Sequence, residues 1–304
     1  PAGHAACGGH CIPEVVERLS RHFEVHSFGF RDRDSTPPLI ANHAVIHSLP
    51  WHFNRASHGD KLLKTLIWYL APPFMALKCR FMGIKGVFND ETLPLMPLLL
   101  RVFYGRSVVI TVADFFLTIY ADQKPLLRPL CRLIQAIDFA TWRGLPLIFT
   151  KVNHTHEYLA EHGIERNRIQ TSYNPCDLSV YAPRDREEAR RRLGIAADAT
   201  VLVHHGILHP NKGNDRIIRA LSELREEFPS LVYLLVGSGP EQPTIEKRIE
   251  ELNMQNHVVL TGWLPTQEDV NWAINAADVG LVMRIGQFSD DFHVTDTLAH
   301  EMAC

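Results

Sequence analysis

Residues 204–215 (HHGILHPNKGND) follow an apolar run, expected as a buried strand over 201–205, and lead into a helix expected over 215–228. Gly206 has no side chain, so its backbone can approach a ligand closely. Lys212 comes just before the helix, whose N-terminal N–H groups suit an anion but supply only about half a positive charge. Lys212 would add the charge that a diphosphate needs. The alternative is an exposed lysine in front of an ordinary helix.

A second glycine-rich turn ends the next strand. Residues 231–240 (LVYLLVGSGP) form an apolar run that closes on Gly-Ser-Gly. This G-x-G is typical of dinucleotide-binding folds, but Gln242 stands at the third glycine position, and the following strand leads to Gly262 and Trp263 in place of an acidic residue. The pattern therefore excludes a nicotinamide site. Backbone amides at the carboxyl end of this strand can still hold part of a nucleotide.

Strands and helices alternate around these motifs, which predicts an α/β fold with parallel sheets. The two α/β units are joined near 174–183, and the dense charges of 184–192 indicate a solvated helix face. Buried strands are expected at 108–112, 147–150, 168–172, 201–205, 231–236, 258–261 and 279–283. Helices are expected at 12–23, 126–139, 155–162, 215–228, 244–252, 268–276 and 295–304.

The order of the motifs carries more information than any one of them. They are N-P-C-D at 174–177, G-x-x-x-x-x-K-G at 206–213, V-G-S-G-P at 236–240, T-G-W-L-P at 261–265 and A-D-V at 277–279. This order resembles the retaining, nucleotide-sugar-dependent glycosyltransferases of family 4, most strongly from Phe149 to Asp278. That family has the GT-B architecture, in which two Rossmann-like domains face a cleft. Gly8 and Gly9 match its N-terminal glycine loop, and 109–114 (VITVAD) matches a strand that ends on the acceptor side.

The resemblance implies two domains, an acceptor-side domain at 1–182 and an incomplete nucleotide-sugar domain at 183–304. It implies an enzyme that moves a hexosyl-type sugar from a nucleotide diphosphate-sugar to a glycan, lipid-linked or small-molecule acceptor. The anomeric configuration would be retained, and no metal or other cofactor would be needed. The implied donor-binding residues are Gly8, Gly9, Gly206, Lys212, Gly237, Gly239, Gly262, Trp263, Arg284 and Asp291. The candidate catalytic residues are Lys212, Asp114, His300 and Glu301.

Two departures from the family pattern concern charge. Ile207 stands where an arginine usually follows the glycine, and Ala113 replaces the histidine of a His-Asp pair, leaving Asp114. The second cation for the phosphates would then come from elsewhere. The candidates are Arg284, His205 and His209.

A third departure concerns two glutamates that the family places eight residues apart. Phe292 and His300 occupy these positions, and Glu301 is one residue out of register, a turn of about 100° on a helix. One interpretation is a subtype that uses other residues near the sugar, among them Asp290, Asp291 and His293. A catalytically inactive, nucleotide-sugar-binding homologue is a second, and an epimerase or hydrolase on the same fold is a third.

Both ends are expected to be cut, which makes the chain a fragment. Residues 1–10 (PAGHAACGGH) form a glycine-rich loop with no strand before it, and the last helix stops on apolar residues without a cap. Within the first segment, residue type alone would allow a zinc site, although the spacing matches no familiar finger. Its ligands would be His4, Cys7, His10 and Cys11.

Composition excludes several other classes of protein. The 31 basic and 34 acidic residues leave a net charge of −3, which gives no electrostatic case for nucleic acid. Six scattered cysteines without a C-x-x-C pair indicate reduced thiols in a cytoplasmic protein. The apolar stretch 65–77 is interrupted by two prolines and is shorter than the roughly 20 residues that a membrane span needs. The basic and apolar residues of 61–106 would instead suit peripheral contact with the inner face of a membrane.

Overall fold

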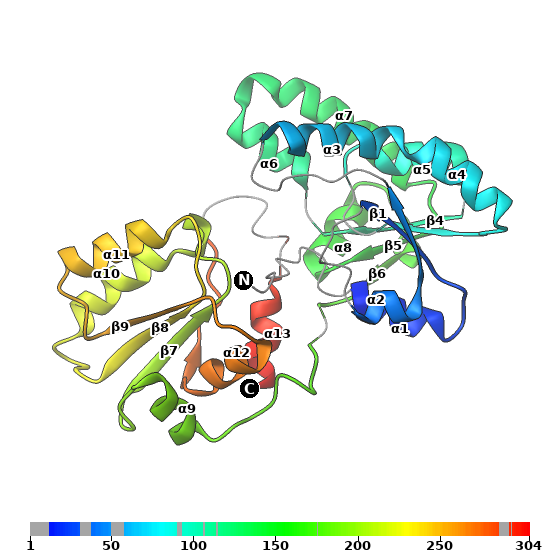
Figure 1. The fold of residues 1–304 in the computed structure, drawn as a ribbon. Coiled ribbons are helices and arrows are strands. Elements are labelled where there is room, and N and C mark those ends of the chain that lie inside the picture. Colours follow the sequence, from blue (N-terminus) through cyan, green and yellow to red (C-terminus); the bar gives the residue numbers. More distant parts are fainter. Residues whose placement is uncertain are drawn as a thin grey trace. The chain divides into compact units, whose positions relative to one another are not determined.

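The computed structural model of the 304-residue chain describes residues 12–30, 38–49, 58–89, 93–105, 107–113, 115–174, 176–285, 292 and 294–304. It divides into two compact units. The first holds the described residues up to Tyr173 together with Phe292, and the second holds those from Asn174 to Ile285 and Val294–Cys304. Each unit contains a four-stranded parallel sheet with helices packed on it, which confirms the predicted α/β class (Figure 1).

The first unit contains a four-stranded parallel sheet in the order β3-β4-β5-β6 and a separate parallel pair, β1 and β2. The strands are β1 (His26–Phe30), β2 (Val45–Leu49), β3 (Val87–Asn89), β4 (Val108–Val112), β5 (Leu147–Thr150) and β6 (Ile169–Thr171). The helices are α1 (Ile12–Ser20), α2 (Pro38–His43), α3 (His58–Leu70), α4 (Pro72–Phe81), α5 (Met96–Tyr104), α6 (Phe116–Gln123), α7 (Arg128–Trp142) and α8 (Asn153–Glu161). Two single turns of 3₁₀ helix are η1 (Pro125–Leu127) and η2 (Arg166–Arg168).

The core of this unit lies between the central strands and the helices α5 and α7. Val108 and Ile110 of β4 are fully buried, because a strand in the middle of a parallel sheet is covered on both faces. Leu100 of α5 and Trp142 of α7 pack into the same cluster. Figure 1 shows α3, α4, α5, α6 and α7 gathered on one side of these strands.

The second unit is a four-stranded parallel sheet in the order β10-β7-β8-β9. Its strands are β7 (Thr200–His205), β8 (Leu231–Val236), β9 (Val258–Gly262) and β10 (Val279–Gly280). Its helices are α9 (Arg186–Leu193), α10 (Asn214–Leu224), α11 (Gln242–Glu251), α12 (Gln267–Asn275) and α13 (Asp296–Ala303), with the 3₁₀ turn η3 (Pro210–Lys212).

Strand β8 shows why its sequence is a continuous apolar run. Tyr233 and Leu235 belong to the core cluster that α10 and α11 form on one face of the sheet. Leu234 and Val236 belong to the cluster of α9 and α12 on the other face. Successive side chains of a strand alternate between faces, so a strand covered on both sides needs apolar residues throughout.

The second unit begins at Asn174, whereas the sequence analysis placed the second domain at 183–304. The connecting segment belongs to this unit because two asparagines of α12 hold it. Asn271 Oδ1 accepts a hydrogen bond from Ala182 N at 3.2 Å, and Asn275 Oδ1 accepts one from Arg184 N at 2.7 Å.

One local expectation was wrong, and a second holds only in part. The last strand was expected over 279–283, but β10 ends at Gly280 because the chain turns toward η3, where Ile285 N donates to Asn211 O at 2.9 Å. The charged run 184–192 was expected to be a solvated face, but Arg190 is buried. Its guanidinium lies 2.7 Å from Asp278 Oδ2 and donates to the Ala276 carbonyl. A helix face that is mostly charged therefore contains one arginine that anchors it to the sheet.

Candidate functional site

Three loops meet at the carboxyl edge of the sheet in the second unit. His205, at the end of β7, pairs with Val236 at the end of β8, and Val236 pairs with Gly262 at the end of β9. The predicted donor-binding glycines Gly206, Gly237 and Gly262 therefore lie at one edge. Open parallel α/β sheets bind their ligands at this edge.

Two of the glycines are required by contact between loops. Gly237 has a φ of +132°, and a Cβ atom there would overlap the Gly206 carbonyl oxygen. A Cβ on Gly239 would overlap the Leu208 carbonyl. Hydrogen bonds join the loops, since Gly206 N donates to Val236 O at 2.8 Å and Leu208 N donates to Ser238 O at 3.1 Å. By contrast, a Cβ on Gly262 would meet no atom within 4 Å, so space is open beside it.

Lys212 lies in η3, one residue before Gly213, the N-cap of α10. Two buried histidines at the end of β7 show where its charge acts. The pKa values of both His204 and His205 are lowered to about 4, mainly by burial and in part by the Lys212 ammonium. The ammonium therefore acts at the carboxyl end of β7, where an anion at the N-terminus of α10 would bind.

Arg284 acts at the same place. The bond from Ile285 N to Asn211 O holds the segment after β10 against the turn that carries Lys212. The Arg284 guanidinium also contributes to the lowered pKa of His204, behind burial and Lys212. Two cations at one sheet edge match the charge of a diphosphate.

The other two candidates for the second cation fit less well. Because burial lowers the pKa of His205 to about 4, its ring is neutral at pH 7. His209 is exposed, and its Nδ1 lies 2.9 Å from Asn211 Oδ1. Of the three candidates, Arg284 alone is permanently charged at this site.

His205 joins both candidate residues of α13. Its Nδ1 lies 3.3 Å from Glu301 Oε1 and its Nε2 lies 3.1 Å from His300 Nδ1. His300 stacks on Tyr181, with ring centroids 3.8 Å apart and an interplanar angle of 6°. Glu301 packs against Gly280, and burial raises its pKa to about 8. The adjacent residues His300 and Glu301 can both contact His205 because the two ring nitrogens of His205 point in different directions.

The sequence predicts two members of this cluster, His300 and Glu301, but not their contacts with His205 and Tyr181. His205 was named only as a possible cation and Tyr181 not at all as a site residue. The signal was present, since His205 ends an otherwise apolar strand and a polar side chain there needs partners. Which partners it finds depends on the placement of α13, which no local pattern encodes.

The structure describes only some of the remaining predicted residues. Trp263 follows β9 and is half-exposed. Gly8, Gly9, Asp114 and Asp291 lie outside the described residues, as do Asp290, His293 and the proposed zinc set. Phe292 is buried in the aromatic core of the first unit, with its ring centroid 5.0 Å from those of Phe115 and Tyr158. Among the described residues, no group of His, Cys, Asp and Glu side chains is placed to hold a metal ion.

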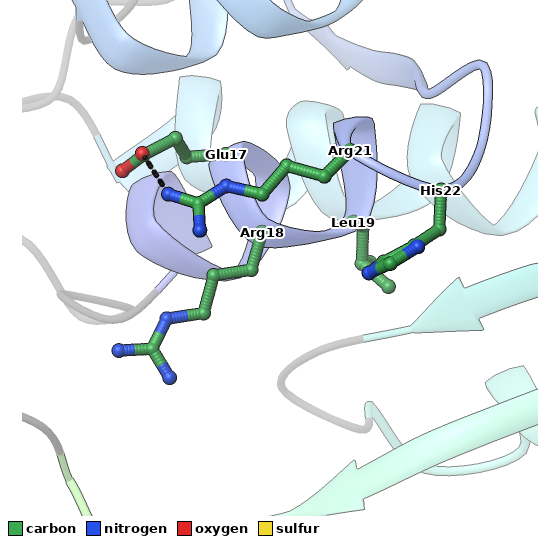
Figure 2. Close-up of a pocket in the computed structure, with 5 residues that line it drawn as sticks. All are labelled: Glu17, Arg18, Leu19, Arg21 and His22. Atoms are coloured by element: carbon green, nitrogen blue, oxygen red, sulfur yellow. Dashed lines mark hydrogen bonds and ion pairs between the residues drawn. The ribbon is translucent and has the colours of Figure 1, made fainter.

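Two surface pockets lie away from this edge. One of about 680 Å³ in the second unit borders the Arg190–Asp278 ion pair and includes Glu301, but no other predicted site residue. The other, of about 550 Å³, is lined by α1 and the turn after it. Figure 2 shows its residues, with Arg21 Nη2 paired to Glu17 Oε1 at 2.8 Å. This pocket is a depression along one helix, and none of the residues that line it is a predicted site residue.

The part of the chain that forms this sheet edge matches a known protein family. Residues 185–284 match the family described as "Glycosyl transferases group 1". A stretch of 115 residues is 38% identical to the GDP-mannose-dependent alpha-(1-6)-phosphatidylinositol monomannoside mannosyltransferase of Mycolicibacterium smegmatis, and covers 34% of this chain and 30% of that protein. A stretch of 85 residues is 39% identical to the D-inositol 3-phosphate glycosyltransferase of a Nocardioides species, and covers 25% of this chain and 19% of that protein. The matches thus span less than a third of these relatives.

The likeness of fold extends further along the chain. The structure of Anabaena HepE in complex with UDP matches with a TM-score of 0.67 over 97% of this chain and 74% of that chain, at 17% sequence identity. The predicted GT-B fold with two Rossmann-like units is therefore confirmed. Residues 185–284 thus match the glycosyl transferases group 1 family, and the chain has the GT-B fold.

Proposed function

We propose that this protein transfers a sugar from a nucleotide diphosphate-sugar to an acceptor, with retention at the anomeric carbon. The observation that carries this proposal is the position of Lys212 in the turn before α10, where the hydrogen bond from Ile285 N to Asn211 O holds the segment that contains Arg284 against the same turn. Two cations beside a helix N-terminus would stabilise the charge that develops on a departing diphosphate. Support for a nucleotide-sugar donor also comes from the family match over 185–284.

The residues take distinct parts in this proposal. Lys212 would neutralise the leaving diphosphate, and Arg284 would take the place of the arginine that Ile207 replaces. Gly262 and Trp263 would lie beside the nucleotide, where open space borders the glycine. Gly8 and Gly9 would face the donor from the first domain, and Asp114 would act on the acceptor side. We propose no metal, because two fixed cations supply the charge.

The partners follow from the same proposal. The acceptor would be a glycan, a lipid-linked sugar or a small molecule. We also propose peripheral contact with the inner face of a membrane by a cytoplasmic protein. The four described cysteines are unpaired, as in a reducing compartment. Retention rests on the resemblance to family 4, and the anomeric configuration of the product, read by NMR, tests it.

Calorimetry with UDP and GDP tests the phosphate site directly. We expect Lys212→Ala to weaken binding of the diphosphate about 10- to 100-fold, the effect of a lost hydrogen bond between charged groups. Lys247→Ala is the matched control, because Lys247 is 76% exposed on α11 and pairs with Glu251. Equal affinity in Lys212→Ala and the unchanged protein would overturn the assignment.

Two alternatives give different outcomes with the same protein. An inactive homologue, which the substitutions at Ile207 and His300 favour, would bind the diphosphate without turning over a sugar donor. An epimerase or hydrolase would convert the donor without acceptor present. A product assay with and without acceptor therefore separates the three functions.

A further inference from the structure

Helix α3 is apolar on the side that faces away from the core. Its Trp68 and Tyr69 pack against the core of the first unit. On the opposite side, Leu63, Leu66 and Leu70 are 48%, 54% and 60% exposed. The spacing i, i+3, i+7 puts these three leucines on one stripe. The helix therefore carries an apolar stripe that the described part of the unit does not cover.

Helix α4 repeats the pattern. Ala76 and Cys79 are buried, whereas Phe74, Leu77 and Phe81 are 75%, 56% and 84% exposed on the opposite side. These three residues again follow the spacing i, i+3, i+7. An exposed phenylalanine at each end of a ten-residue helix costs free energy in water, since each exposes a large apolar surface.

Helix α7 and the turn before it form a third stripe. Phe139 and Trp142 face the core. The outward residues Leu126, Leu130, Leu133 and Ile137 are 96%, 52%, 59% and 36% exposed. The stripes of α3 and α7 point away from one core cluster, and Figure 1 shows α3, α4 and α7 gathered on one side of the strands. We call the outward apolar residues of these three helices and η1 the outer face.

The helices that carry the outer face also have exposed basic residues. Helix α4 contains Lys78 and Arg80, both exposed, and no acidic residue. Helix α7 contains Arg128 and Arg132, both exposed, and its one acidic residue, Asp138, is buried. Arg128 Nη2 lies 3.8 Å from Asp122 Oδ1 of α6, so Arg132 is the cation of α7 that is available to a partner without breaking this pair. The whole chain has a net charge of −3, so these two helices are more basic than the chain as a whole. Two copies packed through this face would bring like charges together, which disfavours self-association.

We propose that the outer face docks on an anionic lipid bilayer. Its leucine and phenylalanine side chains would enter the boundary between headgroups and acyl chains, and its lysines and arginines would contact anionic headgroups. The helices would lie in the plane of the interface, and no helix among the described residues is long and apolar enough to span a bilayer. The inference specifies the membrane contact proposed above and does not depend on sugar transfer.

Vesicle flotation tests the proposal with the 304-residue chain. The vesicles are phosphatidylcholine alone, or phosphatidylcholine and phosphatidylglycerol in a two-to-one ratio. We expect the protein to float with the anionic vesicles and much less with the neutral ones. Replacing Lys78 and Arg80 by glutamine should lower partitioning roughly fivefold per charge, the equivalent of about 1 kcal/mol for each basic residue.

The apolar contribution needs its own variant. Phe74→Ser with Phe81→Ser should reduce flotation at least 10-fold, and circular dichroism should stay unchanged because both side chains are exposed. Phe228→Ser is the matched control, since Phe228 is 47% exposed in the second unit. Unchanged flotation of the double variant, or no flotation of the native chain, overturns the proposal. A third outcome also overturns it: the native chain binds neither kind of vesicle but forms a dimer, and the double variant abolishes that dimer.

Discussion

The Nδ1 atom of His205 lies 3.3 Å from Oε1 of Glu301, and both side chains are only 7% exposed. Burial acts on the two groups in opposite directions. It lowers the pKa of the imidazole to about 4 and raises the pKa of the carboxyl to about 8. Between these values both groups are neutral, so the contact is a hydrogen bond between a carboxylic acid and an imidazole rather than an ion pair.

This assignment predicts how stability depends on pH. The folded Glu301 holds its proton up to about pH 8, whereas the unfolded residue loses it near 4.3. The folded state therefore binds more protons in this window, and its contribution to stability falls as pH rises. His204 and His205, with lowered pKa values, act oppositely, but only from about pH 4 to 6.5. Asp138, whose pKa burial raises to about 6, contributes to the fall at lower pH only.

The window from pH 6.5 to 8 thus isolates Glu301. We expect the free energy of unfolding of the native protein to fall there by roughly 1–2 kcal/mol, since one proton is worth about 1.4 kcal/mol per pH unit. Glu301→Gln removes the titrating group and should flatten the curve, as measured by urea unfolding at a series of pH values. Glu250→Gln, at an exposed position of α11, should leave the slope unchanged. A slope in Glu301→Gln equal to the native one would show that another group titrates.

How much of the molecule the sequence predicts depends on whether a pattern is local. The strands at 108–112, 147–150 and 231–236 have the expected bounds, because a buried strand needs an unbroken apolar run and shows it. The order β10-β7-β8-β9 and the meeting of three loops at one edge follow from parallel α/β topology. The helices α3, α4 and α5 were not among the predicted helices, because they are apolar nearly all round and show no clear periodicity.

The site divides in the same way. Lys212 was predicted from its glycine and the helix that follows, and it lies in η3 directly before α10. The contacts of His205 with His300 and Glu301 were not predicted, because His205 is 95 and 96 residues from them in sequence and meets them only when α13 packs on β7. Arg190 was misjudged because the partner that keeps it buried, Asp278, belongs to a distant strand connection.

Arg284 should contribute to diphosphate affinity without being needed for folding. Arg284→Gln removes a cation that acts beside Lys212, so we expect the affinity for UDP or GDP to fall about 10-fold in calorimetry. Arg166→Gln is the control, because Arg166 is 61% exposed in the first unit and pairs with Glu157. Equal losses in both variants would point to a general charge effect, and no loss in Arg284→Gln would leave Lys212 as the phosphate cation.

The ion pair of Arg190 and Asp278 should contribute more to the free energy of unfolding than the exposed ion pairs on the same helix. Asp278→Asn removes the charge that faces a guanidinium only 7% exposed, and it weakens the acceptor for Val201 N, now 2.8 Å away. We expect the free energy of unfolding to fall by about 3 kcal/mol, since a buried charge is left without its partner. Arg191→Gln, on the same helix but 75% exposed and paired with Glu188, should change it by about 0.5 kcal/mol or less. Urea unfolding of both variants makes the comparison.

Glycine at 262 is favoured by its positive φ alone, whereas glycine at 237 is favoured by both its positive φ and its close contact with another loop. Alanine at Gly262 would adopt a φ of +64° with no atom within 4 Å of its Cβ, so the cost is conformational, about 1–2 kcal/mol. Alanine at Gly237 would adopt a φ of +132° and also overlap the Gly206 carbonyl oxygen, so the loops that carry the candidate site must separate. We expect Gly237→Ala to lose more stability than Gly262→Ala in urea unfolding, and to weaken UDP or GDP binding as well. If the two variants lose equal stability, the contact between the loops is not what fixes glycine at 237.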